Sequence, residues 1–318
     1  MKVISYTATL PSKMMHRSDY TSNAKWITLN KFIEGVNACG DRGIVWSEMS
    51  YQPSEVAVML GWVHENGKTA PHLRFRQTIL DQQRKKANRV VIADSNLFLY
   101  KDLANPLNYL RYSFDGVFPN TGEYCDSRPT SHRWDKISKD LELKLRGWRT
   151  NGDHILLCLQ RNGGWSMGPL AVPNWAFDNI CTLRKYTDRP IKIRVHPGDR
   201  SARSYAHNIM NSVNKHGIQN ITVSNFDLPF IKDLKNAWAV VNHNSSPAVG
   251  ASIEGIPVFV TDPEKSPAKD IANTDLRIIE SPKLMDREPW VHRLAQFHWS
   301  WDDLTSGACW QHMRQWVK

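Results

Sequence analysis

The chain has 318 residues, 41% of them hydrophobic, and a mean hydropathy of −0.49, which is enough apolar material for two domains. No apolar run approaches the roughly 20 residues of a membrane-spanning helix, and the N-terminus lacks a signal-peptide pattern, so we expect a cytoplasmic protein without a membrane partner. Its 41 Lys and Arg against 31 Asp and Glu give a net charge of +10, which favours an anionic partner, nucleic acid being the commonest large one.

The first half of the chain alternates short apolar runs with helical segments. We expect strands at residues 1–10, 43–46, 56–60 and 89–93, and helices at 23–38, 73–87 and 134–145. The strand at 89–93 should run parallel to its neighbours, because helical crossovers intervene. Turn signals mark a mixed region around 105–122, and the turn at 151–153 predicts a domain boundary near residue 150.

The second half alternates in the same way. We expect strands at 154–160, 191–195, 221–224, 239–242 and 258–260, and helices at 175–186, 201–216, 228–236 and from about 247 to 254. This pattern predicts a Rossmann-like α/β domain. The Trp-rich end, 290–316, predicts one or two helices with one apolar face. Five scattered cysteines without metal-ligand spacing indicate reduced thiols.

Two strand ends in the second half carry residues typical of a phosphate site. Arg194 and His196 end one apolar run, with Arg200 shortly after, and Ser245 and Ser246 follow another. Ligands of open parallel sheets bind at the carboxyl ends of strands. A helix starting near residue 247 would add free N–H groups and the positive end of its dipole. We therefore predict a diphosphate held there by charge-assisted hydrogen bonds.

Further residues extend this site. Glu254 lies about two turns into that helix, where a carboxylate could accept both hydroxyls of a ribose. A glycine turn after the strand at 154–159 would let backbone N–H groups approach a sugar or diphosphate, although an ordinary β-turn explains it equally well. The predicted nucleotide-sugar site comprises Gln160, Gly163, Gly164, Arg194, His196, Arg200, Ser245, Ser246 and Glu254.

These motifs resemble the nucleotide-binding half of GT-B glycosyltransferases, especially capsule and sialyl-type enzymes with a His-Pro motif and a downstream serine pair. The segments at 60–62, 90–94, 112–116 and 156–160 extend the resemblance to phage DNA (5-hydroxymethylpyrimidine) glucosyltransferases, over residues 55–270. The family's Arg-Pro-His-Pro is Arg-Val-His-Pro here, at 194–197. The resemblance implies two Rossmann-like domains facing a central cleft: 1–150 for the acceptor, 151–295 for the nucleotide sugar, and a helix at 296–318 packing back on the first domain.

An acceptor hydroxyl must lose a proton as it attacks the anomeric carbon, so we expect a carboxylate or histidine in the first domain. Asp94 is the leading candidate because it ends an apolar strand, although a carboxylate there is also a common helix cap. Asp115 is second, followed by Asp19 and His64. The sequence lacks the Asp-x-Asp motif of metal-dependent GT-A enzymes in a suitable place. We therefore expect no obligatory metal, with Mg²⁺ at most assisting product release.

Basic residues gather in the first domain and predict a polyanionic acceptor. The predicted DNA-binding residues are Arg74, Arg76, Arg84, Lys85, Lys86, Arg128 and Arg133. The run 84–86 is equally well explained as a solvated helix end.

The first hypothesis is a monomeric viral enzyme that transfers glucose from UDP-glucose to 5-hydroxymethylcytosine in double-stranded DNA, in the infected cell's cytoplasm. The second keeps the enzyme class but takes a capsule or lipopolysaccharide glycan as the acceptor, with the positive charge facing an anionic membrane surface. The third is a non-catalytic nucleic-acid-binding protein on a GT-B scaffold.

Overall fold

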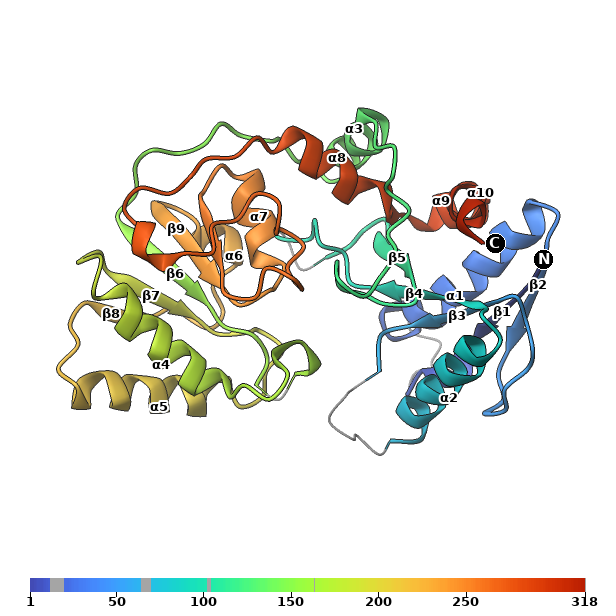
Figure 1. Ribbon diagram of the computed structural model, residues 1–318, viewed down its shortest axis with the longest axis horizontal. Coiled ribbons are helices and arrows are strands. Elements are labelled where there is room, and N and C mark those ends of the chain that lie inside the picture. Colours follow the sequence, from blue (N-terminus) through green and yellow to red (C-terminus); the bar gives the residue numbers. More distant parts are fainter. Residues whose placement is uncertain (12–19, 64–69, 102–103, 163, 318) are drawn as a thin grey trace. The chain divides into compact units, whose positions relative to one another are not determined.

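The chain forms two compact units (Figure 1). The computed structural model describes residues 1–11, 20–63, 70–101, 104–162 and 164–317. Unit 1 comprises Met1–Asn96, Asn105–Arg133 and Arg293–Lys318, and unit 2 comprises Leu97–Ala104 and Trp134–His292. The helices α3 (Ser131–Asp140) and α8 (Glu288–Gln296) lie where the chain changes units. The boundaries near 150 and 295 differ from this division and stay predictions.

Unit 1 is built on a six-stranded sheet in the order β11-β5-β4-β3-β1-β2. Its strands are β1 Lys2–Tyr6, β2 Arg42–Trp46, β3 Val56–Leu60, β4 Arg89–Asp94, β5 Leu110–Phe114 and β11 His298–Trp299. β4 is parallel to β3, as predicted, but antiparallel to β5. The expectation that both neighbours of β4 are parallel is wrong, because no described helix lies between Asp94 and Leu110 to carry the chain across the sheet.

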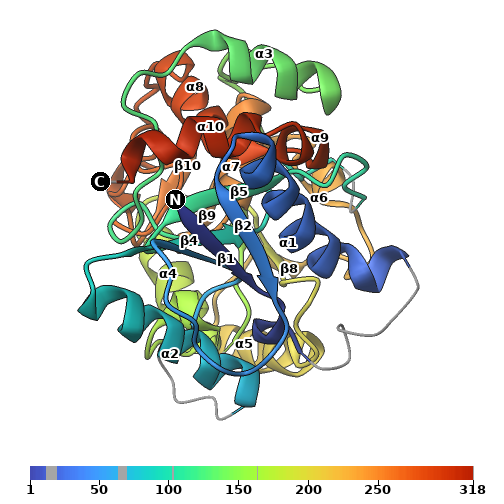
Figure 2. The same cartoon turned by 90° about the vertical axis from the view of Figure 1, so that its right-hand side faces the viewer.

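Helices cover both faces of this sheet (Figure 2). The helices α1 (Tyr20–Ala38), α9 (Trp301–Thr305) and α10 (Ala308–Met313) lie on one face, and α2 (Pro71–Lys85) lies on the other. Alternate residues of a strand point to opposite faces. Val58 accordingly joins the buried cluster that contains Phe32 and Trp310, whereas Tyr6 packs edge-on against Phe75 with 5.7 Å between ring centroids. The predicted return of the C-terminal segment to the first half of the chain is confirmed.

Unit 2 is built on a parallel five-stranded sheet in the order β10-β9-β6-β7-β8. Its strands are β6 His154–Cys158, β7 Ile191–Arg194, β8 Ile221–Val223, β9 Ala237–Asn242 and β10 Val258–Val260. Besides α3 and α8, its α-helices are α4 Val172–Leu183, α5 Ala202–Lys215, α6 Phe230–Asp233 and α7 Pro247–Ile253. The helices α4 and α5 share a buried cluster with one face of the sheet, and α7 packs against β9 and β10. The predicted α/β fold class is confirmed.

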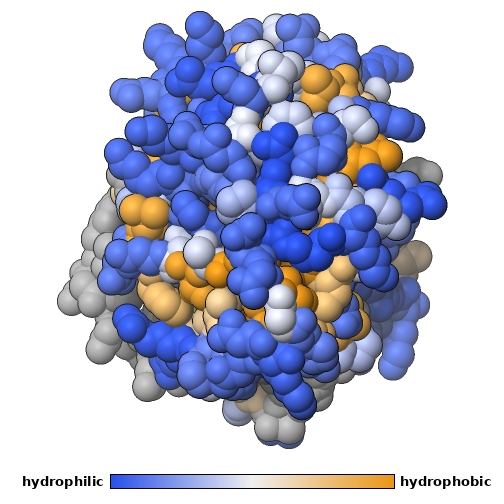
Figure 3. All heavy atoms as spheres, turned by 90° about the vertical axis from the view of Figure 1, so that its left-hand side faces the viewer, coloured by the Kyte–Doolittle hydropathy of each residue, from blue (hydrophilic) through white to orange (hydrophobic). Residues whose placement is uncertain are grey.

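The surface shows no dominant apolar area on the face drawn in Figure 3, where apolar side chains form small groups among hydrophilic ones. Large exposed hydrophobic side chains of unit 2 include Leu170, Tyr186 and Leu284. Within the described part of the chain, no helix is long and apolar enough to cross a membrane. All five cysteines are free.

Candidate functional site

The carboxyl edge of the unit 2 sheet gathers three predicted segments. Gln160 follows β6, His196 follows β7 and Ser245 follows β9. Because β6 lies between β7 and β9, the strand order brings these segments side by side although they are distant in sequence. Parallel strands of an open sheet place ligands at this edge.

Gln160 holds Asn244 in position. Asn244 is not among the site residues predicted from the sequence. Its Oε1 accepts the Asn244 backbone N–H at 3.0 Å, and its Nε2 donates to Asn244 Oδ1 at 2.9 Å and to Ser166 Oγ at 2.7 Å. Asn244 in turn donates to Asp262 Oδ2 at 2.9 Å. Gln160 and Asn244 are both buried, so this network fixes the loop after β9 rather than offering the glutamine to a ligand.

The turn after β6 is tied to the His-Pro loop after β7. The Arg161 guanidinium donates to the Gly198 carbonyl at 2.6 Å, and the Asn162 N–H donates to Asp199 Oδ2 at 2.7 Å. Gly164 is buried, and a Cβ there would lie 2.9 Å from the Arg161 carbonyl oxygen. The second glycine of this turn, Gly163, lies outside the described residues. The two loops therefore form one continuous surface at this edge.

His196 faces this edge as a neutral donor. Its Nδ1 accepts the Gly198 backbone N–H at 3.0 Å, so the ring proton of the neutral imidazole sits on Nε2. Burial and the nearby Arg161 charge lower the pKa of His196 below its ordinary value. A lowered pKa favours the neutral ring at physiological pH, whereas the predicted charge-assisted bond requires the protonated ring.

Arg194 is turned away from the predicted diphosphate. Its guanidinium forms an ion pair with the fully buried Asp233 and donates to the Leu228 carbonyl at 2.8 Å. The prediction that Arg194 binds a diphosphate is wrong, because successive side chains of a strand point to opposite faces of the sheet. Ile193 points to the face that packs on α5, so Arg194 points to the other face. A buried carboxylate without this partner would be strongly destabilising.

Glu254 lies at the far end of α7 from the serine pair. It caps the C-terminus of that seven-residue helix, and its carboxylate accepts from Tyr100 Oη at 2.8 Å and pairs with Arg146 at 2.9 Å. Together with Asp153 and Asn236, which precede β6 and β9, it lines a cavity at the amino edge of the sheet. The assignment of Glu254 to a ribose at the carboxyl edge is therefore wrong.

The remaining predicted residues lie at the carboxyl edge. Ser246 is exposed at the N-cap of α7 and makes no side-chain cap bond. Ser245 Oγ and Asn242 Oδ1 are buried and have no hydrogen-bond partner among the described residues. Arg200 is exposed and has no ion-pair partner in the described part of the chain. Unsatisfied buried polar atoms are uncommon and accompany functional sites.

In unit 1, Asp94 lines a cavity of about 380 Å³ at the carboxyl ends of β3 and β4. The other lining residues are Ala24, Lys25, Thr28, Leu60, Gly61, Arg76, Ser95, Asn105, Asn108 and Leu110. Arg111 donates to Asp94 Oδ2 through Nη2 and, at 3.1 Å, through Nε. The other oxygen, Oδ1, has no hydrogen-bond partner among the described residues. The cavity thus combines a carboxylate with cationic and amide side chains.

Arg76 is built into the wall of this cavity. Its Nε donates to the Thr9 carbonyl at 3.1 Å and its Nη1 to the Trp62 carbonyl at 2.9 Å, and burial lowers the pKa of its guanidinium to about 10. Gly61 has φ +83°, and a Cβ there would lie 2.9 Å from Arg76 Nη1. The prediction that Arg76 contacts DNA at the surface is therefore wrong, since its side chain is buried.

Asp115 lies at the opposite edge of the unit 1 sheet. Since β5 runs antiparallel to β4, its end meets the start of β4, where Asp115 Oδ1 accepts the Val90 N–H at 2.8 Å and Oδ2 pairs with Arg89 at 2.5 Å. This position removes Asp115 from the candidate bases at the Asp94 edge. Asp19 and His64 lie outside the described residues.

The predicted DNA-binding residues divide by exposure. Arg133 is buried, pairs with Asp303 at 3.1 Å and lies 3.9 Å from the Trp299 ring centroid, so its assignment is wrong. The others are exposed: Arg74, Arg84, Lys85, Lys86 and Arg128. The described residues include no group of three or more His, Cys, Asp or Glu arranged to hold a metal ion.

No family model matches the sequence, and no curated protein matches it. Among solved structures, Thermosulfurimonas dismutans KpsC, a β-Kdo 2,7 transferase, has a TM-score of 0.52 at 13% identity, over 97% of this chain and 98% of that chain. The chain has a GT-B fold. A second structure of KpsC, a β-Kdo 2,4 transferase, has a TM-score of 0.47 at 13% identity, over 80% of this chain and 87% of that chain. The cluster at the carboxyl edge of unit 2 and the Asp94 cavity of unit 1 are the two candidate sites.

Proposed function

We propose that this protein is a glycosyltransferase that uses a nucleotide sugar. The observation that carries the proposal is the cluster at the carboxyl edge of unit 2, where Gln160, His196 and Ser245 lie on neighbouring strand ends of a GT-B fold. Such an edge suits a phosphorylated ligand because it offers a helix terminus, hydroxyls and a ring N–H together.

In this proposal unit 2 binds the nucleoside diphosphate. His196 Nε2–H and the exposed hydroxyl of Ser246 donate to phosphate oxygens, and the exposed Arg200 neutralises charge on the leaving group. The donor we propose is a UDP-sugar, with UDP-glucose first, and Mg²⁺ has no role beyond product release. Asp94 in unit 1 accepts the proton of the acceptor hydroxyl through its free oxygen.

The acceptor proposal has two forms. The net charge of +10 and the exposed cations Arg74, Arg84 and Arg128 of unit 1 support 5-hydroxymethylcytosine in double-stranded DNA. The fold similarity to a β-Kdo transferase favours a capsule or lipopolysaccharide glycan instead. Positive charge suits the phosphates of DNA in the first form and an anionic membrane surface beside the glycan in the second, so the net charge alone does not separate the two forms.

The deciding experiment offers the protein both acceptors together with a panel of nucleotide sugars. Mass spectrometry of nucleosides from hydroxymethylcytosine DNA should show a gain of one hexose if DNA is the acceptor. A gain on the glycan alone would transfer the proposal to the glycan form.

Two further results bear on the enzyme class. Release of nucleoside diphosphate that depends on the acceptor would exclude a non-catalytic nucleic-acid-binding scaffold. Salt-sensitive DNA binding without turnover of any donor in the panel would overturn the enzyme proposal in favour of that scaffold.

A further inference from the structure

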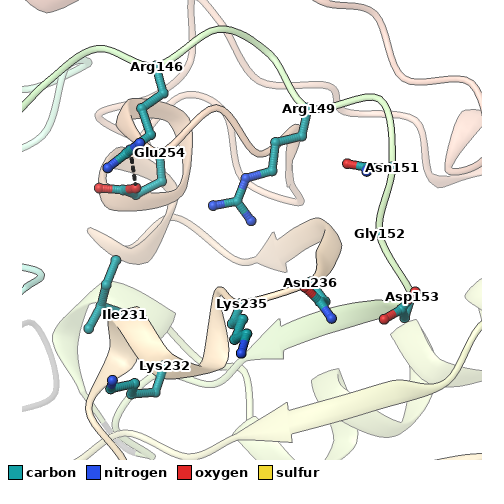
Figure 4. Close-up of a pocket in the computed structure, with 10 residues that line it drawn as sticks. All are labelled: Arg146, Arg149, Asn151, Gly152, Asp153, Ile231, Lys232, Lys235, Asn236 and Glu254. Carbon is teal, nitrogen blue, oxygen red and sulfur yellow. Dashed lines mark ion pairs between the residues drawn. The ribbon is translucent and has the colours of Figure 1, made fainter.

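The amino edge of the unit 2 sheet carries a second cavity, of about 660 Å³ (Figure 4). It lies at the opposite edge from Ser245 and His196, since Asp153 and Asn236 in its wall directly precede β6 and β9. Its volume falls within the roughly 300 to 1,000 Å³ range of small-molecule sites. The full lining is Arg146, Arg149, Asn151, Gly152, Asp153, Ile231, Lys232, Lys235, Asn236 and Glu254.

The charge of this cavity is mainly positive. Arg146 and Arg149 lie on one wall and Lys232 and Lys235 on the facing wall (Figure 4). Arg146 is matched by Glu254, but the other three cations have no carboxylate at ion-pair distance among the described residues. Elsewhere in unit 2 several arginines are neutralised, for example in the pairs Arg189–Glu280, Arg194–Asp233 and Arg277–Asp275. Four cations against the two carboxylates of Asp153 and Glu254 leave a net positive charge on this concave surface, which attracts an anion.

The arginine wall is preorganised. The Arg146 N–H donates to the Ile253 carbonyl at 2.9 Å and the Arg149 N–H to the Gly255 carbonyl at 2.6 Å, which pins this segment along the end of α7. The Arg149 guanidinium donates to the Leu234 carbonyl at 2.9 Å, and Glu254 orients Arg146, whose side chain remains 58% exposed. Groups fixed before binding lose less entropy when a ligand arrives.

The lysine wall is equally defined by the backbone. Lys232 lies in α6, and Lys235 lies in the turn that follows, where its N–H donates to the Lys232 carbonyl at 3.3 Å. The Asp153 N–H donates to the Asn236 carbonyl at 2.8 Å and closes the end of the cavity. Gly152 is required there, because a Cβ would lie 2.5 Å from the Trp238 backbone.

From this arrangement we infer that the cavity binds a compact soluble anion carrying two or more phosphate groups. Guanidinium forks match phosphate oxygens in pairs, and lysine ammonium groups supply point charges to the same oxyanions. A recess of this size holds a small molecule rather than a rod-like duplex. This site is separate from the one proposed for the nucleotide sugar and goes beyond the proposed function.

The test is a calorimetric titration of the whole protein with sodium tripolyphosphate at low salt. The Lys232→Gln/Lys235→Gln variant should bind at least about tenfold more weakly than wild type, since it loses two charge-assisted contacts to the phosphate oxygens. Both lysines are exposed, so the fold should be retained. The matched control is Lys185→Gln/Lys215→Gln, which removes two exposed lysines of the same unit outside the cavity and should bind like wild type.

Two results would overturn the inference. One is that wild type shows no saturable binding of tripolyphosphate. The other is that the control variant binds tripolyphosphate as weakly as the Lys232→Gln/Lys235→Gln variant, which would mean that binding depends only on the net charge of the protein. The affinity for UDP should be unchanged in the Lys232→Gln/Lys235→Gln variant, because the proposed UDP site lies at the other edge of the sheet. Failure of the glycosyltransferase proposal would leave the tripolyphosphate result untouched, so the two outcomes are distinguishable.

Discussion

Asp94 has two tasks at the edge of the unit 1 sheet. Its Oδ2 neutralises Arg111, whose side chain is only 8% exposed, while Oδ1 is left for another partner. Removing a carboxylate from such a pair leaves an uncompensated buried cation. The residue therefore contributes to stability as well as to the chemistry proposed for it, and an experiment must separate the two.

We predict that Asp94→Asn lowers kcat/KM for glycosyl transfer by about 100-fold or more, because an amide cannot accept the acceptor's proton. The free energy of unfolding should fall by about 3 kcal/mol, since Arg111 loses its counter-charge. Kinetics at a temperature where circular dichroism shows the folded variant, together with urea unfolding, would measure both effects.

The matched control is Asp115→Asn. Asp115 directly follows the strand β5 and also pairs with an arginine, but it lies at the opposite edge of the same sheet. Its loss should reduce stability less, since the side chain is 36% exposed, and should leave transfer within a few-fold of wild type. Equal loss of transfer in both variants would mean that Asp94 is a structural ion-pair partner and not the base.

At the scale of elements, the turn after α7 joins two segments of unit 2. Gly255 has φ +81°, and a Cβ there would lie 2.0 Å from the Gly147 carbonyl oxygen. The same contact region contains the backbone bonds of Arg146 and Arg149 to residues 253 and 255. Close backbone approach at this turn therefore holds the arginine wall of the second cavity.

We predict that Gly255→Ala lowers the free energy of unfolding much more than Gly217→Ala. Gly217 has φ +65°, but a Cβ there would meet no atom within 4 Å, so its replacement should cost only the left-handed strain of about 1 kcal/mol. Gly255→Ala should cost at least about 2 kcal/mol more, because the carbonyl must move. If urea unfolding gave the same loss of unfolding free energy for both variants, the 146–149 segment would be able to move away from an alanine at 255 at no cost in stability.

Strand positions were predictable where an apolar run is bounded by polar residues. The strand at 56–60 has the predicted bounds, and the run ending at Asp94 was predictable to within one residue. The antiparallel direction of β5 was missed because helical crossovers were expected on both sides of β4, whereas no described helix lies between Asp94 and Leu110; the pairing of β5 with β11 joins segments far apart in sequence. The assignment of Leu97–Ala104 to unit 2 depends on long-range contacts such as the bond from Tyr100 to Glu254.

Site residues were predictable as positions on an edge but not as directions of side chains. His196 and Ser245 lie at the expected edge because the apolar runs before them end there. Arg194 points elsewhere because the alternation along β7 sends it toward Asp233. The length of α7 carries Glu254 about 10 Å or more along the helix, at 1.5 Å per residue, to the other edge of the sheet. The directions of these side chains depend on contacts with residues distant in sequence, which the local sequence does not predict.

At the scale of the whole molecule, positive charge is only partly neutralised. Ion pairs engage buried cations such as Arg111 and Arg133, whereas exposed ones such as Arg74 and Lys235 have no ion-pair partner among the described residues. The net charge of +10 therefore lies largely at the surface, where it can act on a polyanion and remain sensitive to salt.

Several histidines make stability depend on pH across the whole chain. Burial lowers the pKa of His298 to about 3, assisted by the charges of Arg111 and Arg133, and burial also lowers the pKa of His154 and of His312. Their ordinary value in an unfolded chain is about 6.5. Between the folded and unfolded values the unfolded chain binds more protons, so stability rises with pH in this window and falls as the pH is lowered.

We therefore predict that the urea midpoint falls steadily from about pH 7 to about pH 4, with His298 alone contributing up to about 1.4 kcal/mol per pH unit below about pH 6.5. His298 Nδ1 lies 2.7 Å from the Leu294 carbonyl, so His298→Gln lowers stability at neutral pH but removes one protonation from the unfolding reaction. The pH dependence of the variant should accordingly be shallower than that of wild type. An unchanged slope would mean that His298 is already protonated, or reached by water, in the folded protein.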